Sequence, residues 1–234
     1  MKKTTTLLFI TLLSLGLNAQ SLLPIKYGIK VGANIANISS TQNDGASPID
    51  NSAQIGVAGG FYMEIPLNDK WYLNPELIYA QKGASFTYDY THNYPVNEKD
   101  EYTTTNTLKL AYVEINPTIS YKASQKLALN FGPSVAFLIQ VDSTFTEKLI
   151  SEAPASTTSK ATLYESESLD VGLNLGISYY LTENFVFESK VNTGFMSIGK
   201  VSKVINPGSP GNAEESNIYD LKNRGIVFSI AYLF

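Results

Sequence analysis

The sequence contains no cysteine, which excludes disulfide frameworks, zinc–thiolate sites, iron–sulfur ligation and a cysteine nucleophile. Charged residues are also scarce, at 16% of the chain against ~25% in average domains, which argues against a disordered chain. The formal net charge of −4 lacks the basic excess of nucleic-acid binders, so no nucleic-acid partner is expected. Strongly apolar runs are missing after the N-terminus, which argues against a helical membrane protein.

The N-terminal residues 1–19 have the layout of a cleavable secretory signal peptide. Lys2 and Lys3 form a short positive region, Leu7 to Leu17 form an apolar stretch, and Ala19 is a small residue for cleavage. The apolar stretch is shorter than the ~20 residues that cross a bilayer. A buried N-terminal helix is the alternative. We therefore predict an exported protein in which residues 20–234 form one domain.

After Gln20, apolar and polar residues alternate with a period of two, which predicts β-strands with one apolar face. The pattern is clearest from Leu127 to Val141, where large apolar residues occupy the odd positions and, apart from Leu138, small or polar residues occupy the even ones. Eight such segments predict an all-β, eight-stranded antiparallel chain. The predicted strands are residues 26–38, 55–66, 71–83, 107–121, 127–141, 169–180, 185–198 and 226–234.

The length of these strands and the order of their connections favour a transmembrane barrel over a soluble sandwich. Most are longer than the ~5–6 residues usual in globular proteins and suit a strand that crosses a bilayer with ~9–11 tilted residues. Short connections of four or five residues alternate with predicted loops of 16, 23, 27 and 24 residues. Barrels inserted from the periplasm have short periplasmic turns and long outer loops, so both termini are expected in the periplasm.

Aromatic residues gather at the strand ends that face the short turns or the termini, as expected for a girdle at a membrane interface. This group comprises Tyr27, Trp71, Tyr72, Tyr121, Tyr179, Phe185, Tyr232 and Phe234. Tyr79, Phe137 and Phe195 are candidates for a second girdle at the opposite strand ends.

The end of the chain, with Phe228, Ile230, Tyr232 and Phe234 at every second position, resembles the C-terminal insertion signal of bacterial outer-membrane barrels. Together with segments 28–34, 75–79, 112–117 and 130–133, it makes the mature chain similar to the outer-membrane β-barrel domain family that includes PorT-like proteins. The resemblance implies an eight-stranded up-and-down transmembrane β-barrel in the outer membrane, inserted by the barrel-assembly machinery. It implies no reaction, and the secretion role of the founding type is not transferred on fold alone.

The polar strand faces place seven charged side chains in the predicted lumen. An eight-stranded barrel is just wide enough for its side chains to fill it, so we predict that these charges form ion pairs in a structural plug. A narrow ion path is the alternative. The predicted lumen residues are Lys30, Glu64, Glu76, Lys82, Glu114, Glu188 and Lys190, of which Lys190 stands where the family usually has an arginine.

The long loops offer little catalytic chemistry. The only histidine, His92, lies in the second predicted loop, and the chain has no G-x-S-x-G, P-loop or H-E-x-x-H motif. Glu147, Glu152, Glu165 and Glu167 share one loop but do not match a calcium loop. We expect no enzymatic activity, cofactor or metal.

The expected role is surface interaction or envelope integrity. The expected partners are outer-membrane lipid, lipopolysaccharide and an unidentified surface or periplasmic protein. An accessory role in envelope transport or secretion is the second hypothesis, and a lipid A-processing enzyme is the third.

Overall fold

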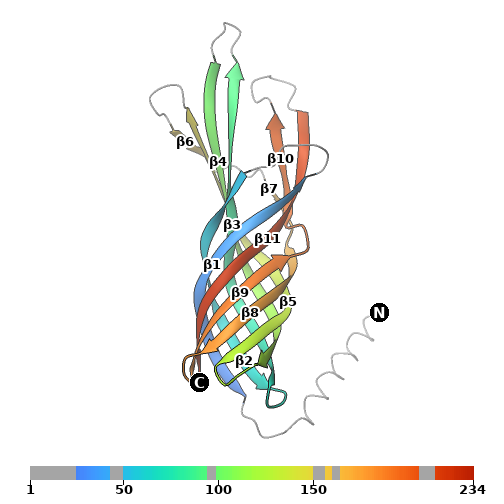
Figure 1. Ribbon diagram of the computed structural model, residues 1–234. Helices are drawn as coiled ribbons and strands as arrows, with labels where there is room; N and C mark the ends of the chain where they lie inside the picture. Colours follow the sequence, from blue (N-terminus) through green and yellow to red (C-terminus); the bar gives the residue numbers. More distant parts are fainter. Residues whose placement is uncertain (1–24, 43–49, 94–98, 150–155, 160–163, 206–213) are drawn as a thin grey trace, which may run out of the picture.

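The computed structural model describes residues 25–42, 50–93, 99–149, 156–159, 164–205 and 214–234. The predicted signal peptide, residues 1–19, lies outside these ranges. All regular elements in the described part are strands (Figure 1), and no helix there is long and apolar enough to span a bilayer. The strands are β1 Lys26–Gln42, β2 Asp50–Pro66, β3 Trp71–Asn93, β4 Lys99–Lys122, β5 Leu127–Leu149, β6 Ser156–Ser159, β7 Tyr164–Ser166, β8 Leu169–Tyr180, β9 Phe185–Gly194, β10 Gly199–Ile205 and β11 Glu214–Leu233.

Eight of these strands form a closed antiparallel ring. The order is β1-β2-β3-β4-β5-β8-β9-β11, and pairing between β1 and β11 closes it. Val31 of β1, for example, faces Gly59 of β2 on one side and Ile230 of β11 on the other. Each ring strand pairs with its neighbours in this order, which confirms the predicted eight-stranded up-and-down barrel.

The ring strands continue beyond the barrel at one end, which we call the loop end. There β3 and β4 pair as far as Asn93 and Lys99, so most of the predicted second loop is a hairpin that stands above the ring in Figure 1. The short strands β6, β7 and β10, which the sequence pattern did not predict, extend β5 and β11 at the same end. The seventh predicted strand is shorter than expected, because β9 stops at Gly194 and not at Ile198.

Tight connections join the strands at the opposite end, which we call the turn end. In each, a side-chain oxygen accepts the backbone N–H of the first residue of the next strand: Asn68 from Trp71 at 3.0 Å, Ser124 from Leu127 at 3.1 Å and Thr182 from Phe185 at 3.0 Å. Asn, Ser and Thr favour turns for this reason. The same local chemistry thus closes each of these three hairpins within four residues.

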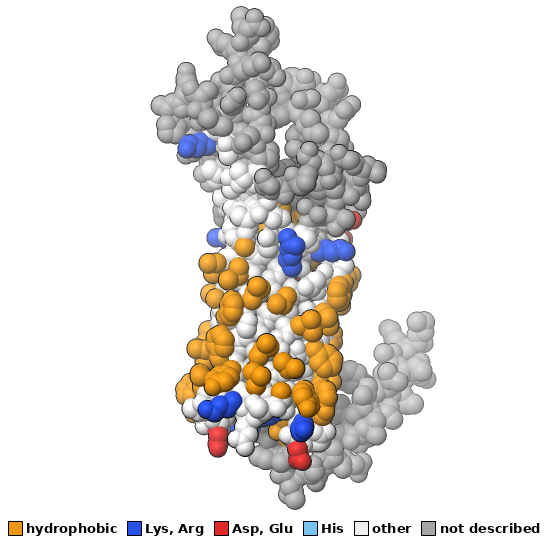
Figure 2. All heavy atoms as spheres, viewed as in Figure 1, with side chains coloured by type: hydrophobic (Ala, Val, Ile, Leu, Met, Phe, Trp, Pro, Cys, Tyr) orange, Lys and Arg blue, Asp and Glu red, His pale blue; other side chains and the backbone are white. Residues whose placement is uncertain are grey.

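The outer surface of the ring is apolar. Large hydrophobic side chains point outward from every ring strand, with exposed fractions as high as 79% for Ile55 and 69% for Val31. Figure 2 shows them as a belt, with Lys, Arg, Asp and Glu side chains beyond its margins. A soluble barrel would bury these side chains, so the belt is a lipid-facing surface.

Candidate functional site

The interior of the ring holds all seven side chains that the alternation places in the lumen. They come from β1, β2, β3, β4 and β9, at positions where most of the neighbouring outward residues are apolar. Each is at most 8% exposed. Burial of unpaired charge is costly, so the arrangement of their partners decides what this interior does.

Four of them form a balanced group, which we call the central cluster: Lys30, Glu76, Glu188 and Lys190. Lys30 Nζ lies 2.5 Å from Glu76 Oε1 and 3.0 Å from Glu188 Oε1. Lys190 Nζ lies 2.7 Å from Glu76 Oε2 and 3.6 Å from Glu188 Oε1. Positive and negative groups alternate around the cluster, so each charge has two opposite neighbours and the four sum to zero.

Amide and hydroxyl groups complete the central cluster. Asn116 Nδ2 donates to Glu76 at 3.3 Å, and Asn130 Nδ2 and Ser178 Oγ donate to Glu188 at 3.2 and 3.3 Å. The Tyr62 ring lies 4.7 Å from Lys30 Nζ, at a distance suited to a cation–π contact. The cluster is therefore hydrogen-bonded as well as ion-paired, as a buried charge network must be to be tolerated.

Nearer the loop end lies a second group, which we call the upper cluster: Lys82, Glu114 and Asp170. Lys82 Nζ is 2.8 Å from Glu114 Oε1 and 3.6 Å from Asp170 Oδ2, and it donates to Asn192 Oδ1 at 3.1 Å. Asp170 was missing from the predicted lumen charges. Its place on the polar face of the sixth predicted strand was the available signal, but it stands at the very start of that strand, next to a long predicted loop.

At the turn end, Glu64 Oε1 accepts a hydrogen bond from the Tyr180 hydroxyl and lies 3.5 Å from Lys122 Nζ. The Lys122 ammonium also lies 3.9 Å from the Tyr72 ring centroid and 4.6 Å from that of Tyr180. Sequence reasoning missed Lys122, because it assigned this residue to a tight turn. In the structure it is the last residue of β4 and reaches back into the ring.

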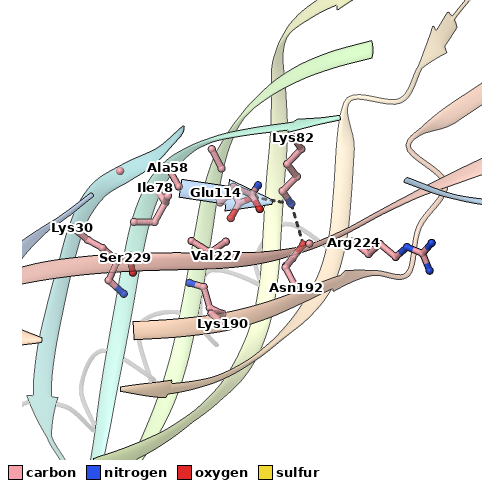
Figure 3. A pocket seen from close by; sticks show the side chains of 14 residues that line it. Lys30, Ala58, Ile78, Lys82, Glu114, Lys190, Asn192, Arg224, Val227 and Ser229 are labelled. Carbon is pink, nitrogen blue, oxygen red and sulfur yellow. Dashed lines mark hydrogen bonds and ion pairs between the residues drawn. The ribbon is translucent and has the colours of Figure 1, made fainter. Parts of the chain in front are cut away.

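A small cavity of about 20 Å³ separates the central and upper clusters. Figure 3 shows Lys82 turned toward Glu114 and Asn192 on one side of it, Lys30 and Lys190 on the other, and Arg224 pointing away. The volume suits about one water molecule, which needs ~10–15 Å³ and polar partners. The buried Asn34 Oδ1 and Ser229 Oγ have no protein partner and belong to residues that line this cavity. The interior is thus filled by side chains, with room for isolated water.

The alternation predicts a polar lumen along the whole barrel, and this prediction is wrong at one end. At the loop end the lining of the lumen becomes apolar, and we call this group the apolar cap: Ile38, Ala84, Phe86, Leu108, Leu110, Tyr112, Ala136, Ile198 and Leu221. Ile198 belongs to the segment after β9 and is held inside by a hydrogen bond from its N–H to Leu221 O at 2.8 Å. This insertion explains why β9 ends early.

The structure describes only part of the loop residues that were considered for catalysis and metal binding. The described residues contain no group of three or more His, Asp or Glu side chains arranged to hold a metal ion. The backbone of His92 pairs with Asp100 near the end of the β3–β4 hairpin, while its side chain lies outside the described part. Glu152 and the side chains of Glu147 and Glu165 also lie outside it.

The C-terminal residues finish the ring. Phe228, Ile230 and Tyr232 point outward into the apolar belt, and Phe234 N donates to Tyr27 O at 2.8 Å. Their predicted role as an insertion signal concerns assembly and stays a prediction.

The sequence was compared with models of known protein families and with curated proteins. The family model described as outer membrane protein beta-barrel domain matches residues 18–199. No curated protein matches the sequence.

Similar solved structures include Ail, the attachment invasion locus protein of Yersinia pestis, at 10% identity and a TM-score of 0.43, covering 91% of this chain and 100% of Ail. OprG from Pseudomonas aeruginosa has 16% identity and a TM-score of 0.37, covering 90% and 94% of the two chains. The outer membrane protease OmpT from Escherichia coli has 12% identity and a TM-score of 0.36, covering 90% and 93%. Likeness at this level carries no conclusion about function.

Proposed function

The chain belongs to the outer membrane protein β-barrel domain family and is therefore an outer-membrane protein, and we propose that it serves surface interaction or envelope integrity rather than transport through its lumen. The observation that carries this proposal is the filled interior. Ion-paired charges and the apolar cap occupy the ring, so partners bind outside the lumen. The surface we propose for them is the loop end, where β3, β4, β5 and β11 extend beyond the barrel.

The proposal includes an orientation. Residues 1–19 act as the signal peptide, the turn end and both termini face the periplasm, and the loop end faces outward. It is supported by the sorting of tight turns to one end and strand extensions to the other, which is the arrangement of outer-membrane barrels.

The absence of cysteine makes the orientation simple to test, because a single introduced cysteine is the only thiol. Lys148 at the loop end and Ala123 at the turn end are both exposed. We expect a membrane-impermeant maleimide to label Lys148→Cys on intact cells and Ala123→Cys only after the outer membrane is opened. The reverse pattern would show the opposite orientation.

The role of the loop end is tested by shortening it. Thr87 and Thr105 face each other across β3 and β4, so a two-residue Asn-Gly turn can join them and close the hairpin just above the ring. The matched control is the full-length chain at equal surface level. We expect the shortened variant to insert normally but to lose partners recovered by pull-down from native membranes, or to sensitise cells to detergent. Unchanged partners and unchanged sensitivity would refute the proposal.

Within the family we further propose the PorT-like group, on the segments 28–34, 75–79, 112–117 and 130–133. This assignment would favour an accessory role in envelope transport as the second candidate. Recovery of a transport component in the same pull-down would support that role. A non-enzymatic protein is part of the main proposal, since His92 is the only histidine of the chain.

A further inference from the structure

Two irregularities in the ladder flank the β3–β4 hairpin at the same height of the barrel. Between β2 and β3, regular pairing stops at Ala53 opposite Ala84 and resumes at Ala58 opposite Ala80. Between β4 and β5, the register shifts as Ala111 faces Gln140 and Tyr112 faces Leu138. Bulges of this kind redirect side chains and recur at barrel rims and beside functional sites. Here they open a pocket of about 170 Å³ in the outer wall.

The pocket is lined by hydrogen-bonding groups although it adjoins the apolar belt. Three amides, two cations and an anion contribute to it: Gln54, Gln81, Gln140, Lys82, Lys109 and Asp142. Lys82 is already paired with Glu114 inside the ring, so Lys109 is the exposed cation of the pocket. The first two amides are held in place, because Gln54 Nε2 donates to Ser85 Oγ at 2.7 Å and Gln81 Nε2 donates to Tyr79 Oη at 3.2 Å. The side chains of Gln140 and Lys109 are exposed. This lining suits a ligand with hydroxyl groups and negative charge.

The position of the pocket along the barrel axis indicates which layer of the membrane would supply its ligand. Its belt-side margin contains Ile55, among the most exposed hydrophobic residues, and the exposed Tyr79. Lys109 stands two positions along β4 from Ala111, farther toward the loop end. The pocket therefore lies where an apolar surface gives way to charge, which in a membrane barrel is the level of the lipid headgroups.

We propose that this pocket binds the sugar-phosphate headgroup of an outer-leaflet glycolipid. Lys109 pairs with a phosphate, and the amides of Gln81 and Gln140 exchange hydrogen bonds with sugar hydroxyls. The volume of about 170 Å³ is below the ~300 Å³ of sites for drug-sized ligands, so it admits one sugar ring or one phosphate while the rest of the headgroup lies outside. The proposal rests on the outward orientation proposed above.

The experiment is a titration of the purified full chain in detergent with lipopolysaccharide, read out by native mass spectrometry. The variants Lys109→Met and Gln140→Leu remove one charge and one exposed amide. The matched control is Arg224→Met, because Arg224 is an exposed cation that does not line the pocket. It lies at nearly the same height, since it pairs with Asn37 of β1 and the adjacent Ala36 pairs with Gln54. We expect roughly tenfold weaker binding for Lys109→Met, the effect of one lost charge-assisted hydrogen bond, a smaller loss for Gln140→Leu and none for Arg224→Met.

Equal losses in Lys109→Met and Arg224→Met, or no loss in either pocket variant, would overturn the proposal. Two further arms identify the ligand: phosphatidylglycerol should not compete, and a free phosphorylated disaccharide should compete weakly. Competition by phosphatidylglycerol equal to that of lipopolysaccharide would reduce the site to a general anion site and refute the glycolipid assignment. Binding in detergent does not depend on orientation, so failure here is distinct from failure of the cysteine-labelling experiment.

Discussion

At the residue scale, Glu76 is the side chain on which the lumen depends most. It accepts both lysines of the central cluster, one on each carboxylate oxygen, and it is 4% exposed. Both lysines are buried, so solvent cannot take over its role freely. Glu188 alone would then have to balance two ammonium groups inside the barrel.

Replacing Glu76 by glutamine should therefore destabilise the protein strongly. Loss of one partner of a buried ion pair costs about 3–5 kcal/mol, because it leaves charge uncompensated. We expect Glu76→Gln to lower the urea concentration at which half of the barrel in lipid vesicles is unfolded. The folded fraction is measured from the electrophoretic mobility of unheated samples. Glu183→Gln, an exposed position in a tight turn, is the control and should match the natural chain. Equal midpoints for the two variants would show that the central cluster adds nothing to stability.

Residue-scale features were predictable where the parity of a strand was readable. Lys30, Glu114 and Lys190 lie in the middle of long alternating segments, so their side of the strand followed from counting by two. Lys122 lies at a strand end, where the parity is set by where the turn closes. Asp170 has the parity of the polar face, but it stands at the start of its strand beside a long predicted loop. The Tyr180–Glu64 contact joins residues 116 positions apart, and no local pattern reports it.

At the element scale, the ring strands were predictable and their extensions largely were not. A strand between lipid and lumen has one apolar and one polar face, and this contrast produced the alternation. Beyond the belt the contrast weakens, so β6, β7 and β10 left no period-two signal in the sequence. Segments 85–90 and 102–107 lie almost entirely inside the second predicted loop, but their Thr and Tyr content is typical of strands, and they belong to β3 and β4. The position of Ile198 in the apolar cap could not be predicted in this way, because only tertiary packing turns its side chain inward.

Strand β3 is sensitive to a small change at Gly83, where the pairing with β2 is interrupted. Gly83 has a φ of 148°, and a Cβ added there would lie 2.0 Å from Leu108 O on β4. We expect Gly83→Ala to destabilise the barrel by about 1–3 kcal/mol, the range for a residue held in a sparsely populated conformation. The measurement is the urea midpoint in vesicles.

Gly59→Ala is the matched control for that substitution. Gly59 lies in β2, and its closest contact to an added Cβ is a carbonyl oxygen at 3.1 Å. A small shift can relieve this approach, so we expect a lesser effect. If the two alanine variants unfold at the same urea concentration, the positive φ of Gly83 is not a source of strain in the β2–β3 break.

At the scale of the whole molecule, the low charge of the sequence has a structural cause. The outer wall consists largely of apolar residues. Among the described residues, eight acids and lysines are buried inside the ring, where each acid contacts a lysine, a tyrosine or an amide. The charged layers lie between two less polar ends: the apolar cap at the loop end, and Tyr62, Tyr180, Val186 and Leu233 at the turn end. This layering keeps the network away from both aqueous sides.

The same layering predicts that the barrel does not conduct. An eight-stranded barrel has an interior just wide enough for its own side chains, and here three layers stand in series: the cap, the upper cluster and the central cluster. We expect no stable current steps in planar bilayers, with an open porin as the positive control. Ile198→Gly removes one side chain from the cap but leaves both clusters, so it should also stay silent. Stable openings in the natural chain would show that the ion pairs part to admit ions, whereas openings confined to Ile198→Gly would show that the cap alone had sealed the lumen.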